Sequence, residues 1–322
     1  MLTKSWMRAA FCAVALCAAA AHADSFPAKP VTMIVPYPAG GATDVVARAV
    51  SEQLASAWKQ PVVVENRAGA GTTIAAAAVA RAPADGYTLF MTTSAHTISG
   101  HLYSNLTYDA VKDFAPITLV TKVPLVLVVN PDVPAKTLPE FLDYLKQRGS
   151  EVNFASPGNG TAQHLSGELF KLATKAPIMH VPYRGDAPAF TDLAGGQVQM
   201  MLATITSALP LIESGKLRAL AVAHNKRVPA LAQVPTFSEA GMPGFEAATW
   251  FGLLAPAALP PERAQAIYQD VSRIVDTPKM RARIESLGGD VVNSTPQEFA
   301  AFIAAEQEKW GKAVKAAGAA QP

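Results

Sequence analysis

The stretch "VPYPAGGATD" (residues 35–44) joins a β-like run to a segment with helical periodicity. Two prolines and two glycines make it a turn that is shaped by the backbone rather than by side chains. The preceding "VTMIVPY" (31–37) is typical of a strand, and Val46, Val50, Leu54 and Trp58 then follow four residues apart, as on one face of a helix. The sequence therefore predicts a strand, a glycine turn and a helix in succession.

A second stretch, "VNFASPGNGTAQHLSGELF" (residues 152–170), has the same order, with a helix expected from about Thr161. A glycine turn that leads into a helix exposes unpaired N–H groups at the positive end of the helix dipole, where a carboxylate can bind. In a single loop, the simpler interpretation is that glycine permits a tight turn. Two such loops that face each other would hold a molecule with two anionic ends. We expect positive φ, or close approach of a ligand, at Gly41 and Gly160.

Short β-branched runs alternate with amphipathic or alanine-rich segments along the chain, which is the pattern of an α/β fold. The run at 117–130 is long enough for two strands or for one strand that crosses between lobes, and "TWFGLLAP" (249–256) looks like a return strand. Thr137 is a candidate helix cap. We expect two α/β lobes, the first formed by residues 24–123 and 246–322 and the second by residues 124–245.

The first 23 residues have the features of a secretory signal. Lys4 and Arg8 precede an apolar run at 9–21, and the segment ends in the small-residue pattern Ala21-His22-Ala23. A membrane anchor is the alternative, but the apolar run is shorter than the ~20 residues that a spanning helix needs. We expect cleavage before Asp24 and export of the remaining chain.

Charge and cysteine content narrow the classes of partner. The chain has 27 Lys and Arg against 25 Asp and Glu, and loss of residues 1–23 balances the two signs. A neutral chain has no overall field to attract nucleic acid, so no nucleic-acid partner is expected. Both cysteines, Cys12 and Cys17, lie within the signal, so the rest of the chain cannot form a disulfide.

Catalytic and cofactor motifs are absent from the sequence. "NRAGAGTTIAA" has Ile74 where a dinucleotide-binding fingerprint needs its third glycine, and neither glycine turn carries the Gly-Lys-Ser/Thr of a nucleotide-binding loop. No Gly-x-Ser-x-Gly or His-Glu-x-x-His occurs, and the histidines are dispersed. We expect no cofactor, no metal and no enzymatic activity.

Two polar residues beside the loops have open roles. His164 stands in the first turn of the helix predicted from about Thr161, where packing and ligand contact are equally reasonable roles. Asp44 complements the first helix terminus and stands four residues before Arg48, a stabilising spacing. If an anion binds at that terminus, the carboxylate of Asp44 should point away from it.

Six separated motifs carry a family resemblance: "VPYPAGGATDVVAR", "VENRAGAG" with "APADGYTLF", "NFASPGNGTAQHLSGELF", "VPYRGDAPAFTDLAGGQVQMM", "GKLRALAV" and "PTFSEAGMPGFEAATWFGLLAP". Together they resemble the substrate-binding proteins of tripartite tricarboxylate transporters, also called the Bug family. The resemblance implies a type II periplasmic binding protein whose two lobes, joined by crossing strands, close on a small mono-, di- or tricarboxylate. It also implies delivery of that acid to a membrane permease.

The resemblance also implies a binding site in which main-chain groups of the two loops hold the ligand. The first loop supplies Tyr37, Gly40, Gly41 and Thr43, and the second supplies Gly158, Gly160, Thr161 and His164. Ser94, at the end of the strand predicted for "YTLFMTT" (87–93), joins them. Arg184 in "VPYRG" is either a further contact or a solvated loop charge. Residues 202–204 read Leu-Ala-Thr where family members often have Phe-Asp, so the identity of the acid does not transfer.

A transport receptor, acting as a monomer, is therefore the favoured function. A periplasmic sensing protein that presents the same bound acid to a receptor kinase has identical sequence requirements and is the alternative. A secreted hydrolase is a third class, and it lacks a recognisable nucleophile.

Overall fold

The fold is taken from a computed structural model that describes residues 26–318 of the chain. The predicted signal, residues 1–23, lies outside the described residues. Every helix within 26–318 is too short or too polar to cross a membrane.

Ten strands of the described residues form one continuous sheet. Its main path runs β2-β1-β3-β9-β4-β7-β5-β6, and β8 and β10 also pair with β4. The strands are β1 (Val31–Val35), β2 (Val62–Asn66), β3 (Thr88–Thr93), β4 (Phe114–Val129), β5 (Asn153–Ser156), β6 (Met179–Pro182), β7 (Met200–Thr204), β8 (Arg218–Val222), β9 (Ala248–Pro256) and β10 (Asp290–Val291).

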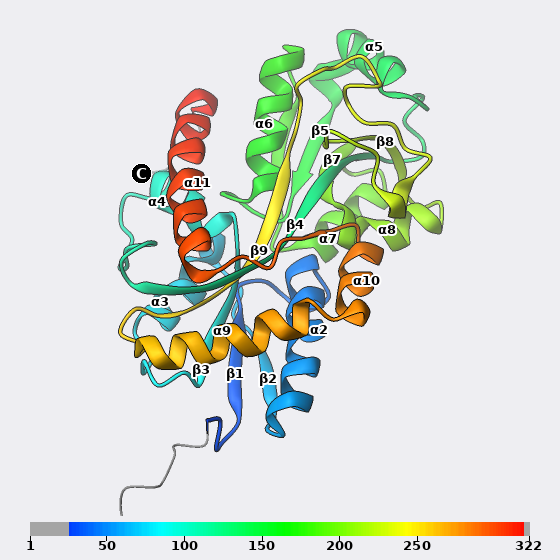
Figure 1. Cartoon of the computed structure of the whole chain (residues 1–322). Coiled ribbons are helices and arrows are strands. Elements are labelled where there is room, and N and C mark those ends of the chain that lie inside the picture. The colour runs from blue at the N-terminus through cyan, green and yellow to red at the C-terminus, as the bar shows by residue number, and fades with distance from the viewer. Residues whose placement is uncertain (1–25, 319–322) are drawn as a thin grey trace, which may run out of the picture.

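Strand β4 links two halves of the molecule by changing partners along its length. From Phe114 to Pro124 it pairs antiparallel with β9, and from Leu125 to Val129 it pairs with β7 and β8. Figure 1 shows β4 and β9 running together between the half that contains β1, β2 and β3 and the half that contains β5 and β7. The run at 117–130 is thus a single crossing strand, and β9 is the expected return strand.

Ten α-helices of the described residues pack around this sheet. They are α2 (Ala42–Trp58), α3 (Thr73–Ala80), α4 (Ala95–Leu102), α5 (Leu138–Arg148), α6 (Ala162–Thr174), α7 (Asp186–Ala194), α8 (Ile205–Glu213), α9 (Pro261–Val275), α10 (Pro278–Ser286) and α11 (Pro296–Ala317). Short 3₁₀ turns lie at Ala70–Thr72, Gly149–Glu151 and Pro229–Leu231.

The periodicity of α2 predicts its buried face correctly. Val46, Val50 and Leu54 lie in the main hydrophobic core, while Trp58 is half-buried and donates its indole N–H to Asp270 Oδ2 at 2.8 Å. The predicted cap of α5 is also confirmed, because Thr137 Oγ1 accepts the Glu140 N–H. Helix α4 was not expected, since its first turn is built from small and polar residues whose burial only the tertiary structure reveals.

The last helix joins the two halves on one side of the sheet. Helix α11 packs against α4 of the first half and α6 of the second, as Figure 1 shows beside the C-terminus. Their shared apolar cluster consists of Ile98, Leu102, Ala162, Leu165, Trp310 and Val314. The two halves are therefore in contact next to their glycine loops, in a closed arrangement.

Candidate ligand-binding site between the two halves

The first glycine loop connects β1 to α2 as the sequence predicts. Gly40 has φ +87°, a backbone conformation that side chains rarely adopt, whereas Gly41 is extended with φ −78° and caps α2. Of the two alternatives expected at Gly41, positive φ or close approach of a ligand, positive φ is therefore excluded, and Gly40 has it instead. Close approach is what Gly41 permits, because a Cβ there would lie 3.1 Å from Asp186 Oδ2 in the other half.

The side chain of Asp44 stabilises this loop through hydrogen bonds. Its carboxylate accepts hydrogen bonds from Gly40 N at 3.0 Å, from Arg48 Nε at 2.9 Å and from Asn66 Nδ2 at 2.9 Å. Burial alone would raise the pKa of Asp44, but these hydrogen bonds outweigh it and hold the pKa below its usual value. The carboxylate thus acts as an internal brace and does not line the cavity described below.

The second glycine loop connects β5 to α6 and has two glycines with positive φ. Gly158 has φ +141° and Gly160 has φ +76°. Thr161 caps α6 by accepting the His164 N–H at 3.2 Å, and His164 Nδ1 in turn accepts the Gly160 N–H at 3.2 Å. The ring nitrogen of His164 thus binds the backbone of the second loop and helps to shape it.

The His164 ring stacks on the His180 ring with centroids 4.0 Å apart, and His180 Nε2 is 2.7 Å from Ser156 Oγ. Burial lowers the pKa of His164 to about 4. Burial, with smaller contributions from the charges of His164 and Lys171, lowers the pKa of His180 to about 3. Both rings are consequently neutral at pH 7, which is the form that lets Nδ1 of His164 act as an acceptor.

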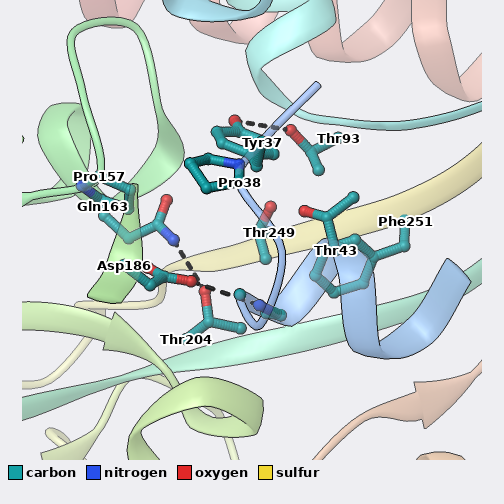
Figure 2. A pocket seen from close by; sticks show the side chains of 12 residues that line it. Tyr37, Pro38, Thr43, Thr93, Pro157, Gln163, Asp186, Thr204, Thr249 and Phe251 are labelled. Atoms are coloured by element: carbon teal, nitrogen blue, oxygen red, sulfur yellow. Dashed lines mark hydrogen bonds between the residues drawn. The ribbon is translucent and has the colours of Figure 1, made fainter. Parts of the chain in front are cut away.

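A cavity lies between the two loops, with an empty volume of about 360 Å³ that includes space open to solvent. Figure 2 shows side chains from both halves pointing into it. The first half contributes Tyr37, Pro38, Gly41, Ala42, Thr43 and Thr93, the second contributes Pro157, Gln163, Asp186 and Thr204, and the crossing strand β9 contributes Thr249 and Phe251.

Hydroxyl groups dominate the polar lining. Tyr37 Oη lies 3.3 Å from Thr93 Oγ1, and Gln163 Nε2 donates to Thr204 Oγ1 at 2.8 Å, both drawn as dashed lines in Figure 2. Burial raises the pKa of Tyr37, so its hydroxyl keeps its proton and can donate it to a ligand. Among the lining residues no Lys, Arg or His occurs, so hydroxyls, an amide and helix N-termini are the available donors for an anion.

Asp186 is the charged residue of this lining. It stands at the first position of α7, and its Oδ2 accepts the Ala42 N–H at 3.3 Å across the gap between the halves. The contact places a carboxylate of the protein itself at the N-terminus of α2.

The residues expected at the site fall into two groups. Tyr37, Gly41 and Thr43 line the cavity. The others are not among its lining residues: Gly40, Ser94, Gly158, Gly160, Thr161, His164 and Arg184. Ser94 contacts the lining indirectly, because its hydroxyl is 3.0 Å from Thr249 Oγ1. The side chain of Arg184 is exposed.

Comparisons with known proteins show the family of the chain. The family model described as the tripartite tricarboxylate transporter family receptor, TctC, matches residues 46–319. The chain belongs to this family. Protein BugT of Bordetella pertussis is 38% identical to this TctC-family chain over 311 residues, which cover 96% of the chain and 95% of BugT.

Solved structures show the same fold. The periplasmic binding protein BugD has a TM-score of 0.88 at 35% identity, over 92% of this chain and 100% of BugD. An R. palustris protein solved with adipate has a TM-score of 0.89 at 35% identity, over 91% of this chain and 98% of that protein. MatC of Rhodopseudomonas palustris, solved with bound malate, has a TM-score of 0.84 at 35% identity, over 90% of this chain and 100% of MatC. The predicted fold, two α/β lobes with a cleft between them, is therefore confirmed.

Several lining residues of this TctC-family chain escaped sequence reasoning. Thr93, Thr204 and Thr249 are almost fully buried and lie on three different strands. A signal was present for two of them, because Thr93 and Thr204 end β3 and β7, where α/β proteins commonly place ligand contacts. Gln163 and Asp186 had no such signal, since each stands in the first turn of a helix whose orientation depends on how the two halves close.

Proposed function

We propose that this protein is a periplasmic receptor that encloses a small carboxylate between its two lobes and delivers it to the membrane permease of a tripartite tricarboxylate transporter. The observation that carries the proposal is the cavity between the N-termini of α2 and α6, which is lined by hydroxyls and an amide. Helix N-termini and neutral donors favour an anion without the need for an arginine. The adipate and malate bound by the two R. palustris structures support a carboxylate as the ligand.

The lobes that close on the acid are residues 24–123 with 246–322, and residues 124–245. The partner change of β4 between Pro124 and Leu125 supports the first boundary. The second is supported by Ala247, whose carbonyl accepts the Leu125 N–H and whose N–H donates to the Ala223 carbonyl, just before β9 joins the first half. The hinge then consists of β4 and β9, whose movement opens and closes the cavity.

In this receptor Tyr37, Gly41 and Thr43 contact the acid directly, together with Thr93, Gln163, Thr204 and Thr249. The other expected residues give the loops their shape: Gly40, Gly158, Gly160, Thr161 and His164 by backbone geometry and capping, and Ser94 by positioning Thr249. A contact between Arg184 and the acid remains a prediction. The protein performs no chemistry on the acid, in line with a family of solute-binding receptors. Export requires the signal at residues 1–23.

A thermal-shift panel tests this function. The protein is refolded from denaturant to remove retained ligand, then heated with mono-, di- and tricarboxylates, sugars, lysine or arginine. A carboxylate that binds only the folded state is expected to raise the melting temperature by several degrees, since a ligand at a hundredfold excess over its Kd stabilises by about 2.7 kcal/mol. A rise with sugars alone would exclude the proposed function.

A further inference from the structure

Asp186 occupies a place where a ligand carboxylate was expected. It belongs to the second half, yet its Oδ2 accepts the Ala42 N–H in the first turn of α2 at 3.3 Å. The same oxygen would lie 3.1 Å from a Cβ added to Gly41, so it is seated directly against the first glycine loop. In this closed arrangement the protein itself supplies an anion to that helix terminus.

The carboxylate of Asp186 is incompletely satisfied. Its second oxygen, Oδ1, is buried and has no hydrogen-bond partner among residues 26–318. The Ser207 hydroxyl is close by, but it donates to the Thr204 carbonyl at 3.2 Å. Burial raises the pKa of Asp186, and the groups that oppose this rise, the Ala42 N–H and the Ser207 hydroxyl, are uncharged. A buried carboxylate oxygen without a partner needs a donor.

Two kinds of ligand group would meet this carboxylate differently. A second carboxylate on the ligand would face a like charge at the same helix terminus, which disfavours binding at neutral pH. A protonated amine would instead supply up to three N–H donors and a compensating charge. The remaining lining is made of hydroxyls, an amide and apolar side chains, so no other charged side chain there competes for the amine.

We propose that Asp186 is a specificity-determining residue, which makes the protein prefer small carboxylates that carry a protonated amine over the same acids without one. This inference rests on the proposed function and narrows its ligand class. The ligand carboxylate is held by the remaining N–H and hydroxyl donors, and the ligand amine faces Asp186.

Calorimetric titration at pH 7 of the refolded, ligand-free protein with matched pairs of acids tests this selectivity. Each pair differs only by an α-amine: succinate with aspartate, glutarate with glutamate, and propionate with alanine. In the wild-type protein, the amino acid of at least one pair is expected to bind about tenfold or more tightly than its partner, as a charge-assisted hydrogen bond allows.

Asp186→Asn keeps the shape of the side chain and removes its charge. It is expected to weaken binding of the amino acid and to strengthen binding of the plain acid. The Kd of the plain acid divided by the Kd of the amino acid should therefore fall by about tenfold or more. The matched control is Asp192→Asn on the same helix. Asp192 accepts the Tyr183 hydroxyl at 2.7 Å and does not line the cavity, so the control should keep the wild-type ratio. Melting temperatures without ligand check that each variant folds, and Asp186→Ser is the replacement if Asp186→Asn does not.

Tighter or equal binding of the plain acid by the wild-type protein in every pair that binds would overturn the inference without any variant. An unchanged ratio in folded Asp186→Asn would overturn it as well. In both cases carboxylate binding itself survives, so the proposed function stands. If no carboxylate of any kind binds, the proposed function fails, and the inference fails with it.

Discussion

Gly160→Val is expected to weaken binding of the cognate acid by about tenfold or more. Two costs combine at this position. Gly160 has φ +76°, which costs a β-branched residue about 1–3 kcal/mol. A Cβ there would also lie 2.7 Å from Leu102 Cδ2, across the contact between the two halves. Because Leu102 is itself packed in the apolar cluster with α11, it has little room to move. The variant should therefore resist closure.

Gly215→Val is the matched control for the backbone cost. Gly215 has nearly the same φ, +71°, but an added Cβ meets nothing within 4 Å, and the residue does not line the cavity. Calorimetry on both folded variants separates the two effects. Gly215→Val should lose some stability and keep its affinity, whereas Gly160→Val should lose both. Equal affinities for the two variants would show that closure does not depend on the Gly160–Leu102 contact.

Stability is expected to fall as the pH is lowered from 7 to 5. The pKa values of His164 and His180 in the folded protein, about 4 and about 3, lie below the ordinary value near 6.5 of the unfolded chain. Below pH 6.5 the unfolded state binds more protons, so the stabilisation is complete above that pH and is lost as the pH falls toward the folded values. Each ring contributes about 2 kcal/mol of loss at pH 5. His96, whose pKa burial lowers to about 4, adds to the loss.

His180→Phe isolates one of these contributions. Phenylalanine keeps the stacking against Phe154 and His164 and removes one titrating ring. The free energy of unfolding, measured with urea at pH 7, 6 and 5, should fall less steeply for this variant, by about 2 kcal/mol over the range. A variant with the full wild-type loss would show that the pKa of His180 is not lowered in the folded protein.

The fold could be predicted from sequence because its signals are local. Proline and glycine at 35–44 and 156–160 mark the two turns, and α6 begins at Ala162, one residue after the expected Thr161. The partner change of β4 could not be predicted, because a continuous apolar run does not reveal which strands lie beside it. The sequence also could not show which glycine of the first loop has positive φ, which is Gly40 rather than Gly41.

The site was only partly predictable for a related reason. Tyr37, Gly41 and Thr43 stand in the loop that suggested binding, and they line the cavity. Thr249 and Asp186 are distant in sequence and reach the cavity only when β9 crosses and α7 closes over α2. Their contribution is a tertiary property, since an isolated threonine on an apolar strand or an aspartate at the start of a helix has other common explanations.

The central claim is that a small carboxylic acid is held between the two glycine loops. A crystal structure of the protein with the acid that raises its melting temperature most tests this directly. We expect a carboxylate of the acid in the cavity, within hydrogen-bond distance of N–H groups at the start of α2 or α6 and of lining hydroxyls such as Thr43 or Thr204. An acid bound elsewhere, or a carboxylate held by Arg184 with both loops empty, would contradict it.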